Sequence, residues 1–429
     1  MSIIDTRSQV FNMLLLLIFL NVLALMPTYL LSEETTLAVT IVLISIDCLV
    51  LFFYTQLRIK NKLVLILINI GLVIRVILLI ANQLYGLNIL HDGNDTEYYH
   101  KQGINFFYNL KNGNIDTLYP SLLGILYFFT DSNRFFAQFL NIVLYFLIFI
   151  YLNKILLMNK VKNKIHIFIL FIFTFFPQSL IFSVILLREN LVAYFVIMAT
   201  YFVLRYLRNC GNSNAYISMV FILLASATHA GSIVLIFPLL IIIMLYSPNE
   251  KRFNVSIVNL MKTTGFISVV TILVILFKDI ILRKFIKETE YDNPFDRLNA
   301  SRGDSAYLTS INVSNNFEVI IFSPLKSLYF YISPVPFDWR NVLDALTFLL
   351  DSSIYLLAII LIIKNFKLIK SNPFMLFLTL SFILVGFVFG YGTFTAGTAM
   401  RHRYKVISIV LLIIAIRKGV KKDENFNYR

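Results

Sequence analysis

The sequence is poor in charged residues and in cysteine. Only 14% of its 429 residues are Asp, Glu, Lys or Arg, two are cysteines, and the mean hydropathy is +0.80. A water-soluble chain of this length would not be so apolar. Cys48 falls inside an apolar run and Cys210 in a basic connecting segment, so we expect no disulfide. The composition excludes an ordinary soluble domain.

Several motifs are also missing from the sequence. It contains no Gly-rich phosphate loop, no Cys/His metal spacing, no low-complexity linker and no obvious short repeat. We therefore infer no certain cofactor, although an acidic segment described below leaves a divalent metal ion open. The net charge of +14 could suggest a nucleic-acid partner. We expect none, because most basic residues lie in short connections between apolar runs, where they set membrane topology.

Apolar runs of about 18–22 residues recur along the chain, and each can cross a hydrocarbon core of roughly 30 Å. Leu-, Ile- and Phe-rich runs of this length are typical of helices. We therefore predict an all-α polytopic membrane protein, with residues 1–429 forming one integral membrane domain of about twelve transmembrane helices. The first run is too long for a signal peptide and is expected to be a retained span. The expected spans are 11–30, 36–56, 63–83, 134–156, 165–183, 190–207, 214–229, 231–246, 265–283, 341–363, 374–392 and 404–417.

Basic clusters follow the even-numbered spans. They include Arg58, Lys60 and Lys62 after the second span, Arg205 and Arg208 after the sixth, and Lys364, Lys367 and Lys370 after the tenth. By the positive-inside rule, both termini are cytoplasmic and the protein is multi-pass. The odd-numbered connections then face outward, and two of them are large, at residues 84–133 and 284–340. The first contains a short apolar stretch at 119–129, which we expect to be an interfacial or re-entrant helix.

Two charged residues lie near the middle of neighbouring spans, where charge is costly and usually has a reason. Asp47 is in the second expected span and Arg75 in the third. The two could form a structural pair with each other. Alternatively, they could serve conduction or coupling in a transporter.

A second group of polar residues comes from separate outward connections at one expected membrane depth. The group comprises Asp92, Asp95 and Glu97 after the third span, Arg188 and Glu189 between the fifth and sixth, His229 after the seventh, and Arg401, His402 and Arg403 before the twelfth. A carboxylate at the membrane surface can act as general base on a sugar hydroxyl. Arg and His can bind a phosphate leaving group and stabilise its developing charge. A substrate with a lipid tail and a phosphate head would sit at this depth.

The order of these features resembles the multispanning GT-C-class glycosyltransferases that use lipid-linked sugars. Asp95-Thr96-Glu97-Tyr98-Tyr99 resembles their Asp-x-x-Tyr-like base motif, with Asp92 as a competing choice. Residues 119–124 and 133–141 resemble the Tyr-Pro and Ala-x-x-Leu-Asn run that follows the base. Residues 187–190 and 228–232 are similar to segments of the Wzy- and EpsG-type polysaccharide polymerases, and residues 397–403 resemble a closing motif of proteins from surface-polysaccharide loci. Two extra spans before the acidic loop favour a polymerase or a reduced family member.

The resemblance implies a bacterial inner-membrane enzyme of O-antigen, capsule or exopolysaccharide assembly. It would transfer sugar from a polyprenyl-(di)phosphate donor, as polymerase or single-sugar transferase, among membrane lipids and with a flippase and chain-length regulator of the same pathway as partners. The candidate catalytic residues are Asp95, Asp92, Glu189 and His229. The candidate phosphate-binding residues are Arg188, Arg401, His402, Arg403 and Arg302. The alternative is a transporter or flippase for a lipid-linked saccharide, since twelve spans with both termini inside is also a transporter plan.

Overall fold

The computed structural model describes residues 19–26, 32–85, 93–112, 118–253, 305–309 and 311–419, together with a few single residues outside these ranges. The described chain is helical almost throughout, as predicted, apart from one short hairpin of β1 (Tyr246–Ser247) and β2 (Arg252–Phe253). The sequence predicts one membrane domain, and the chain forms two compact units. Unit 1 holds residues 1–146 and 180–188, and unit 2 holds residues 147–179 and 189–429.

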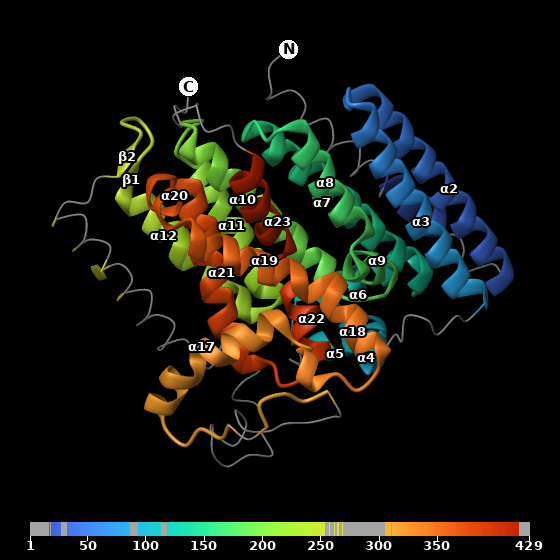
Figure 1. The fold of residues 1–429 in the computed structure, drawn as a ribbon. Helices are drawn as coiled ribbons and strands as arrows, with labels where there is room; N and C mark the ends of the chain where they lie inside the picture. The colour runs from blue at the N-terminus through green and yellow to red at the C-terminus, as the bar shows by residue number, and fades with distance from the viewer. Residues whose placement is uncertain are drawn as a thin grey trace. The chain divides into compact units, whose positions relative to one another are not determined.

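Unit 1 is built around a helical hairpin and a group of shorter helices. Its helices are α2 (Glu33–Arg58), α3 (Lys62–Tyr85), α4 (Gly93–Ile104), α5 (Phe106–Lys111), α6 (Leu118–Thr130) and the first half of α7 (Arg134–Met158). Helices α2 and α3 lie side by side at the blue end of Figure 1. Helix α4 packs on α6, so the described part of residues 84–133, the expected first outer loop, is folded into helices. The apolar stretch at 119–129 is confirmed as helix α6, and its placement in the membrane stays a prediction.

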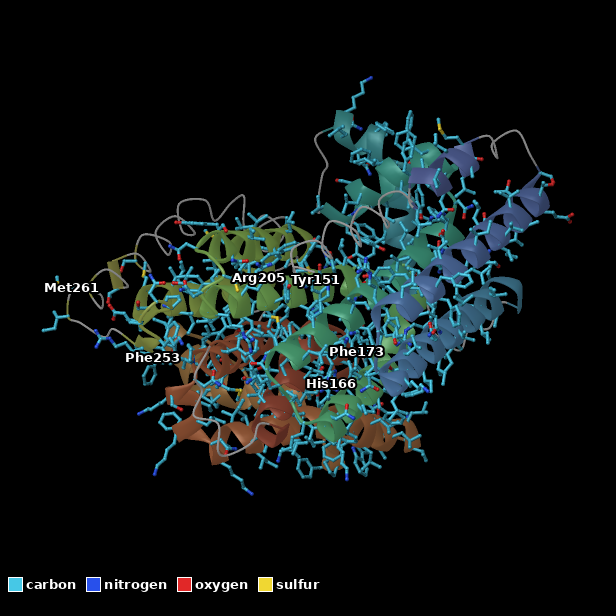
Figure 2. The ribbon with its side chains drawn as sticks, turned by 90° about the horizontal axis from the view of Figure 1, so that it is seen from above. Tyr151, His166, Phe173, Arg205, Phe253 and Met261 are labelled. Carbon is cyan, nitrogen blue, oxygen red and sulfur yellow. The ribbon has the colours of Figure 1, made fainter. Side chains whose placement is uncertain are left out.

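Unit 2 contains most of the remaining helices. They are α8 (Asn163–Phe175), α10 (Glu189–Leu207), α11 (Ser213–Thr228), η3 (Ala230–Leu235), α12 (Ile236–Leu245), α17 (Asn316–Ile332), η4 (Pro336–Asp338), α18 (Val342–Thr347), η5 (Phe348–Ser352), α19 (Ser353–Lys364), α20 (Phe366–Ser371), α21 (Pro373–Gly392), α22 (Ala396–Tyr404) and α23 (Ile407–Gly419). Helix α10 is central to unit 2. In its apolar 18-residue segment, 83% of the residues are buried, whereas the corresponding share for residues 342–364 is only 22%. Figure 2 labels His166 and Phe173 on α8, both buried and seven residues apart, which places them on one face.

Six helices of the described chain are long and apolar enough to cross a membrane, which supports the predicted membrane class. They are Glu34–Arg58, Lys62–Gln83, Arg134–Met158, Glu189–Leu207, Val342–Lys364 and Pro373–Gly392, and they match the expected spans 36–56, 63–83, 134–156, 190–207, 341–363 and 374–392. The expected spans 214–229, 231–246 and 404–417 contain apolar helices of 10–17 residues, shorter than that length. The span 265–283 and most of the span 11–30 lie outside the described residues.

The expected span 165–183 is broken into two helices. Helix α8 ends at Phe175, and α9 (Pro177–Val184) begins at a proline, with a bend of 48° between them. Proline lacks a backbone N–H and clashes with the carbonyl four residues earlier, so it starts a new helix instead of continuing the old one. The pair is therefore one bent span or a re-entrant turn.

Residues 284–340, the expected second outer loop, contain helices in their described part. The first part of this segment lies outside the described residues, and α17 fills much of the rest. Helix α17 packs along α21 (Figure 1). The close approach depends on glycine, because a Cβ at Gly390 would lie 3.0 Å from the backbone of Lys326. The expected loop thus carries a helix that is part of the packed unit.

Candidate functional site

The centre of the candidate site in unit 2 is a buried carboxylate. Glu189 is the first residue of α10 and is completely buried. The helix N-terminus carries partial positive charge, which stabilises an acidic side chain in the first turn. The burial of an ionised carboxylate is nevertheless expensive unless cations and hydrogen bonds accompany it.

Two cations near the end of α22 accompany this carboxylate. Arg401 Nε donates to Glu189 Oε1 at 2.5 Å, and Lys405 Nζ lies 3.8 Å from the same oxygen. Arg401 is partly exposed, with 19% of its side chain accessible, while Lys405 is 1% exposed. The four-residue spacing of Arg401 and Lys405 brings both side chains to one side of the chain. One carboxylate and two cations leave a net positive charge.

Two imidazole rings complete the group. Lys405 Nζ lies 2.8 Å from His402 Nδ1, and the His402 ring lies 4.9 Å from that of His229. Phe389 covers both, with ring centroids 5.1 Å from His229 and 5.3 Å from His402. When Lys405 is charged it is the donor of this contact, and His402 Nδ1 then accepts with the ring proton on Nε2. His402 can then donate or relay a proton at Nε2.

We call Glu189, Arg401, Lys405, His402 and His229 the cation cluster. A positively charged, largely buried group with two imidazoles is suited to bind an anion and to move a proton beside it. Arg401 supplies a planar donor fork that fits phosphate oxygens. The low-polarity surroundings of Phe389 strengthen each of these electrostatic interactions.

Arg403 is placed differently from its neighbour Arg401. Its side chain is fully buried and forms an ion pair with Asp351 of η5. It also donates to the carbonyls of Tyr331 and Ser333, each at 2.8 Å. These contacts close the C-terminal end of α17, where backbone carbonyls need donors. Arg403 thus has structural partners in this fold, and its expected phosphate-binding role stays a prediction.

In unit 1, the acidic segment forms the start of α4. Asp95 lies in the first turn of this helix and is exposed. Glu97 forms an ion pair with Arg134 at the start of α7. The hydrogen bond from Arg134 holds the pKa of the Glu97 carboxyl below its ordinary value. Glu97 thus has a structural partner, and Asp95 remains the candidate base of this helix.

Arg188 belongs to the same unit as Asp95. It is 7% exposed, and its guanidinium carbon lies 5.5 Å from the centre of the Tyr99 ring on α4. Tyr99 is four residues after Asp95, so the two share a helix face. Asn141 Nδ2 fixes the approach to Arg188 by donating to Ile185 O at 2.7 Å and to Leu187 O at 3.2 Å.

Tyr119 and Asn141 belong to the Tyr-Pro and Ala-x-x-Leu-Asn segments of the resemblance. Both lie close to other residues on which the resemblance depends. Tyr119 packs edge-on against Tyr99 at 5.2 Å, and Asn141 holds the segment that ends at Arg188. These contacts bring together three of the separate sequence segments within unit 1. Such packing would also arise in a purely structural core.

The expected site residues thus fall into two groups. Unit 1 carries Asp95 and Arg188, and unit 2 brings Glu189, His229, Arg401 and His402 together. Asp92 and Arg302 lie outside the described residues. Sequence reasoning missed Lys405 and Phe389. The spacing of Lys405 from Arg401 could have revealed it, whereas nothing in the sequence marks Phe389 among 41 phenylalanines.

Comparison with known proteins returned no matching family model, curated protein or solved structure. Within the part of the chain that the structure describes, no three His, Cys, Asp or Glu side chains lie close enough to hold a metal ion.

Proposed function

We propose that this chain is a membrane glycosyltransferase of cell-surface polysaccharide assembly. It would use a polyprenyl-phosphate- or diphosphate-linked sugar as donor on the extracytoplasmic face of a bacterial inner membrane. The observation that carries the proposal is the cation cluster, where Arg401 and Lys405 converge on the buried Glu189 beside His402 and His229. The proposal includes a topology of about twelve transmembrane spans with both termini in the cytoplasm.

In the proposed reaction, an acceptor hydroxyl oxygen attacks the anomeric carbon of the donor sugar. The bond between that carbon and the phosphate oxygen breaks, and its electron pair leaves with the (di)phosphate. Arg401 and Lys405 stabilise this developing negative charge. The hydroxyl proton passes to a general base. His402 Nε2–H can donate to the departing phosphate.

Two kinds of base are candidates. Asp95, or Asp92, has this role on the sequence argument and the resemblance. Glu189 is the carboxylate beside Arg401 and Lys405, and it positions Arg401. Asp95, which belongs to unit 1, stays the base expected from the sequence.

The transporter alternative rests on Asp47 and Arg75. The structure gives each a partner within unit 1: Asn21 Nδ2 donates to Asp47 at 2.5 Å, and Arg75 donates to Gly71 O at 3.0 Å. The Arg75 guanidinium also lies 3.3 Å from the centre of the Tyr145 ring. These local contacts favour a structural role for both residues and so favour the enzyme over the transporter.

The test is a matched pair of ion-pair variants in the full-length protein. Arg401→Lys and Glu189→Gln should lower transfer from a polyprenyl-linked saccharide at least tenfold while the folded yield in detergent is kept. Arg252→Lys and Glu250→Gln are the controls, because Arg252 and Glu250 form an exposed Arg–Glu pair at 2.7 Å on the β1–β2 hairpin. They should transfer sugar at the wild-type rate.

The product pattern in cells separates the two forms of the proposed reaction. Accumulated single lipid-linked repeat units in the Arg401→Lys strain would identify a polymerase, and loss of one sugar from the unit would identify a single-sugar transferase. Wild-type polymer from Arg401→Lys, Glu189→Gln and Asp95→Asn alike would contradict the enzyme.

A further inference from the structure

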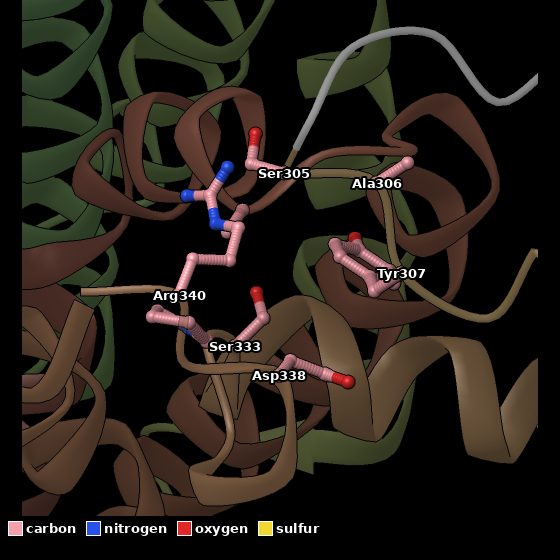
Figure 3. A pocket seen from close by; sticks show the side chains of 8 residues that line it. Ser305, Ala306, Tyr307, Ser333, Asp338 and Arg340 are labelled. Carbon is pink, nitrogen blue, oxygen red and sulfur yellow. The ribbon is translucent and has the colours of Figure 1, made fainter.

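A polar pocket lies in unit 2, apart from the cation cluster (Figure 3). Three of its walls come from residues 305–307, from the turn at 333–334, and from Asp338 and Arg340 at the end of η4, and Ala396 of α22 completes the lining. The empty space between these walls is about 250 Å³ with its open mouth included, so the enclosed part is smaller than that figure. A ligand would therefore enter by one edge only.

Helix α22 fixes two of the three walls. At its N-terminal end, Ala396 N donates to Ser305 O at 3.0 Å, and Thr395 pairs with Ala306 in a β-bridge. Seven residues after Ala396, Arg403 returns to the same side of the helix and donates to Ser333 O. One helix thus holds two separate segments in place. A site fixed in this way loses little entropy on binding.

The pocket contains a hydroxyl group that has no use in the fold. Ser333 is completely buried, and among the described residues its Oγ has no hydrogen-bond partner. Figure 3 shows this hydroxyl directed into the pocket. A buried hydroxyl without a partner costs about 1–3 kcal/mol, so such groups usually meet a ligand or water.

The other polar groups around Ser333 are of mixed type. Asp338 offers carboxylate acceptors, Ser305 a hydroxyl, and Arg340 a guanidinium that Asp344 holds in position with contacts of 2.9 and 3.0 Å. Hydroxyls, a carboxylate and a guanidinium together can donate to and accept from a ligand that itself bears several hydroxyl groups. A purely anionic ligand would be repelled by Asp338, and an apolar one would leave Ser333 without a partner.

We infer that this pocket is a saccharide subsite, which binds one sugar unit of the substrate through its hydroxyl groups. The inference rests on the proposed function for the identity of that substrate. Arg401 follows Ala396 by five residues, which is about 7.5 Å along the helix axis. It also lies on another side of α22, about 140° around from Ala396. The pocket is therefore separate from the phosphate-binding group and holds a sugar unit beyond the reacting bond.

The protein carries its own reporter for this pocket. Trp339 is the single tryptophan of the chain, it lies between Asp338 and Arg340 in sequence, and its Nε1–H donates to Pro334 O at 3.2 Å. Pro334 is itself a lining residue. A sugar that enters the pocket should change the tryptophan emission of the full-length protein in detergent.

The experiment is a fluorescence titration with methyl hexopyranosides and methyl N-acetylhexosaminides. Wild-type protein should respond saturably to at least one of them, and Ser333→Ala should bind it about 3- to 10-fold more weakly, as expected for the loss of one hydrogen bond. Ser408→Ala is the matched control, since Ser408 on α23 is also a buried serine whose Oγ has no partner among the described residues, and it does not line the pocket. It should bind like the wild type.

Transfer from the polyprenyl-linked donor is measured in the same preparations to separate this inference from the proposed function. No emission change in the wild type, or equal weakening in Ser333→Ala and Ser408→Ala, overturns the subsite even if Arg401→Lys abolishes transfer. Selective weakening in Ser333→Ala supports the subsite, and it does so even if Arg401→Lys transfers normally, in which case the proposed function alone fails.

Discussion

Arg401 and Arg403 are two residues apart in sequence, but they perform different tasks. Arg401 meets Glu189 and remains partly open to solvent or substrate, while Arg403 is enclosed by Asp351 and the carbonyls that end α17. Residues that are two positions apart in an α-helix point in directions about 200° apart, so their side chains contact different neighbours. An enclosed cation is a stability element, and a partly open one can serve binding.

This difference predicts that substitution of Arg403 lowers stability, whereas substitution of Arg401 lowers sugar transfer. Arg403→Ala leaves Asp351 buried without its cation and should lower the free energy of unfolding by about 3–5 kcal/mol. The double variant Arg403→Met/Asp351→Leu removes both charges and should lose clearly less than the sum of its single changes. Thermal unfolding in detergent measures this, with exposed Arg252→Ala as a control that should stay near wild type. Additive losses in the double variant would show that the two residues do not form a coupled pair.

A second residue-scale prediction concerns pH. His100 on α4 lies 2.8 Å from the hydroxyl of Tyr127, and burial, aided by the charge of Arg134, lowers its pKa below about 6.5. The folded state therefore favours neutral His100. Its contribution to stability is present above about pH 6.5 and is lost as the pH falls towards the lowered pKa.

The measurement is the unfolding temperature between pH 7.5 and 5. Wild-type protein should lose more stability over this interval than His100→Asn, which cannot take up the proton. The ion pair of Glu97 acts in a separate window, because its lowered pKa removes stability only below about pH 4.5. Parallel curves for the two proteins between pH 7.5 and 5 would contradict the role of His100.

Residue types predict which side chains are chemically able to act. They do not predict which of these side chains belong to the candidate site and which stabilise the fold. The sequence singled out Glu189, His229, Arg401 and His402, and the structure places these four in one cluster. It could not separate Arg401 from Arg403, because their difference depends on Asp351, about 50 positions away in sequence. Lys405 was missed for a related reason: a basic residue at the start of an expected span is usually a snorkelling charge.

At the scale of elements, the packing of α17 on α21 shows what periodicity alone does not predict. Residues 284–340 were expected to form an outer loop, yet α17 within them packs on an apolar helix. An expected span is recognised by an unbroken apolar run, and α17 is interrupted by Glu318, Pro324 and Lys326. The break at Pro177 illustrates the converse, since an apolar run can hide a change of direction.

Glycine at position 390 predicts a sharp sensitivity in this interface. A Cβ there would lie 3.0 Å from Lys326 and Ser327 backbone atoms, which cannot move aside as a flexible side chain could. Gly390→Ala should therefore destabilise unit 2 by about 1–3 kcal/mol, as overpacking typically does. Gly392→Ala is the matched control on the same helix, because its added Cβ would meet nothing within 4 Å. Thermal unfolding should separate the two variants, and equal stability would argue against close contact of α17 with α21.

At the scale of the whole molecule, composition was sufficient to predict an all-α membrane protein. The mean hydropathy and the length of the apolar runs fixed that class, and six helices of the described chain satisfy it. The division into two compact units was beyond the sequence, since it depends on which helices share a core. The sidedness of the membrane comes from the basic connections, and a direct test of it bears on every extracytoplasmic role proposed above.

The two native cysteines provide that test. Cys210 is exposed in the turn between α10 and α11, which the positive-inside rule assigns to the cytoplasm, and Cys48 lies within α2. A membrane-impermeant maleimide should therefore label Cys210 only after cells are permeabilised. A Cys210→Ser protein carrying Tyr108→Cys should be labelled in intact cells, because Tyr108 on α5 is 69% exposed and lies in the connection that is expected to face outward. Labelling of Cys210 from outside would invert the topology, and the cation cluster could then no longer meet a donor on the extracytoplasmic face.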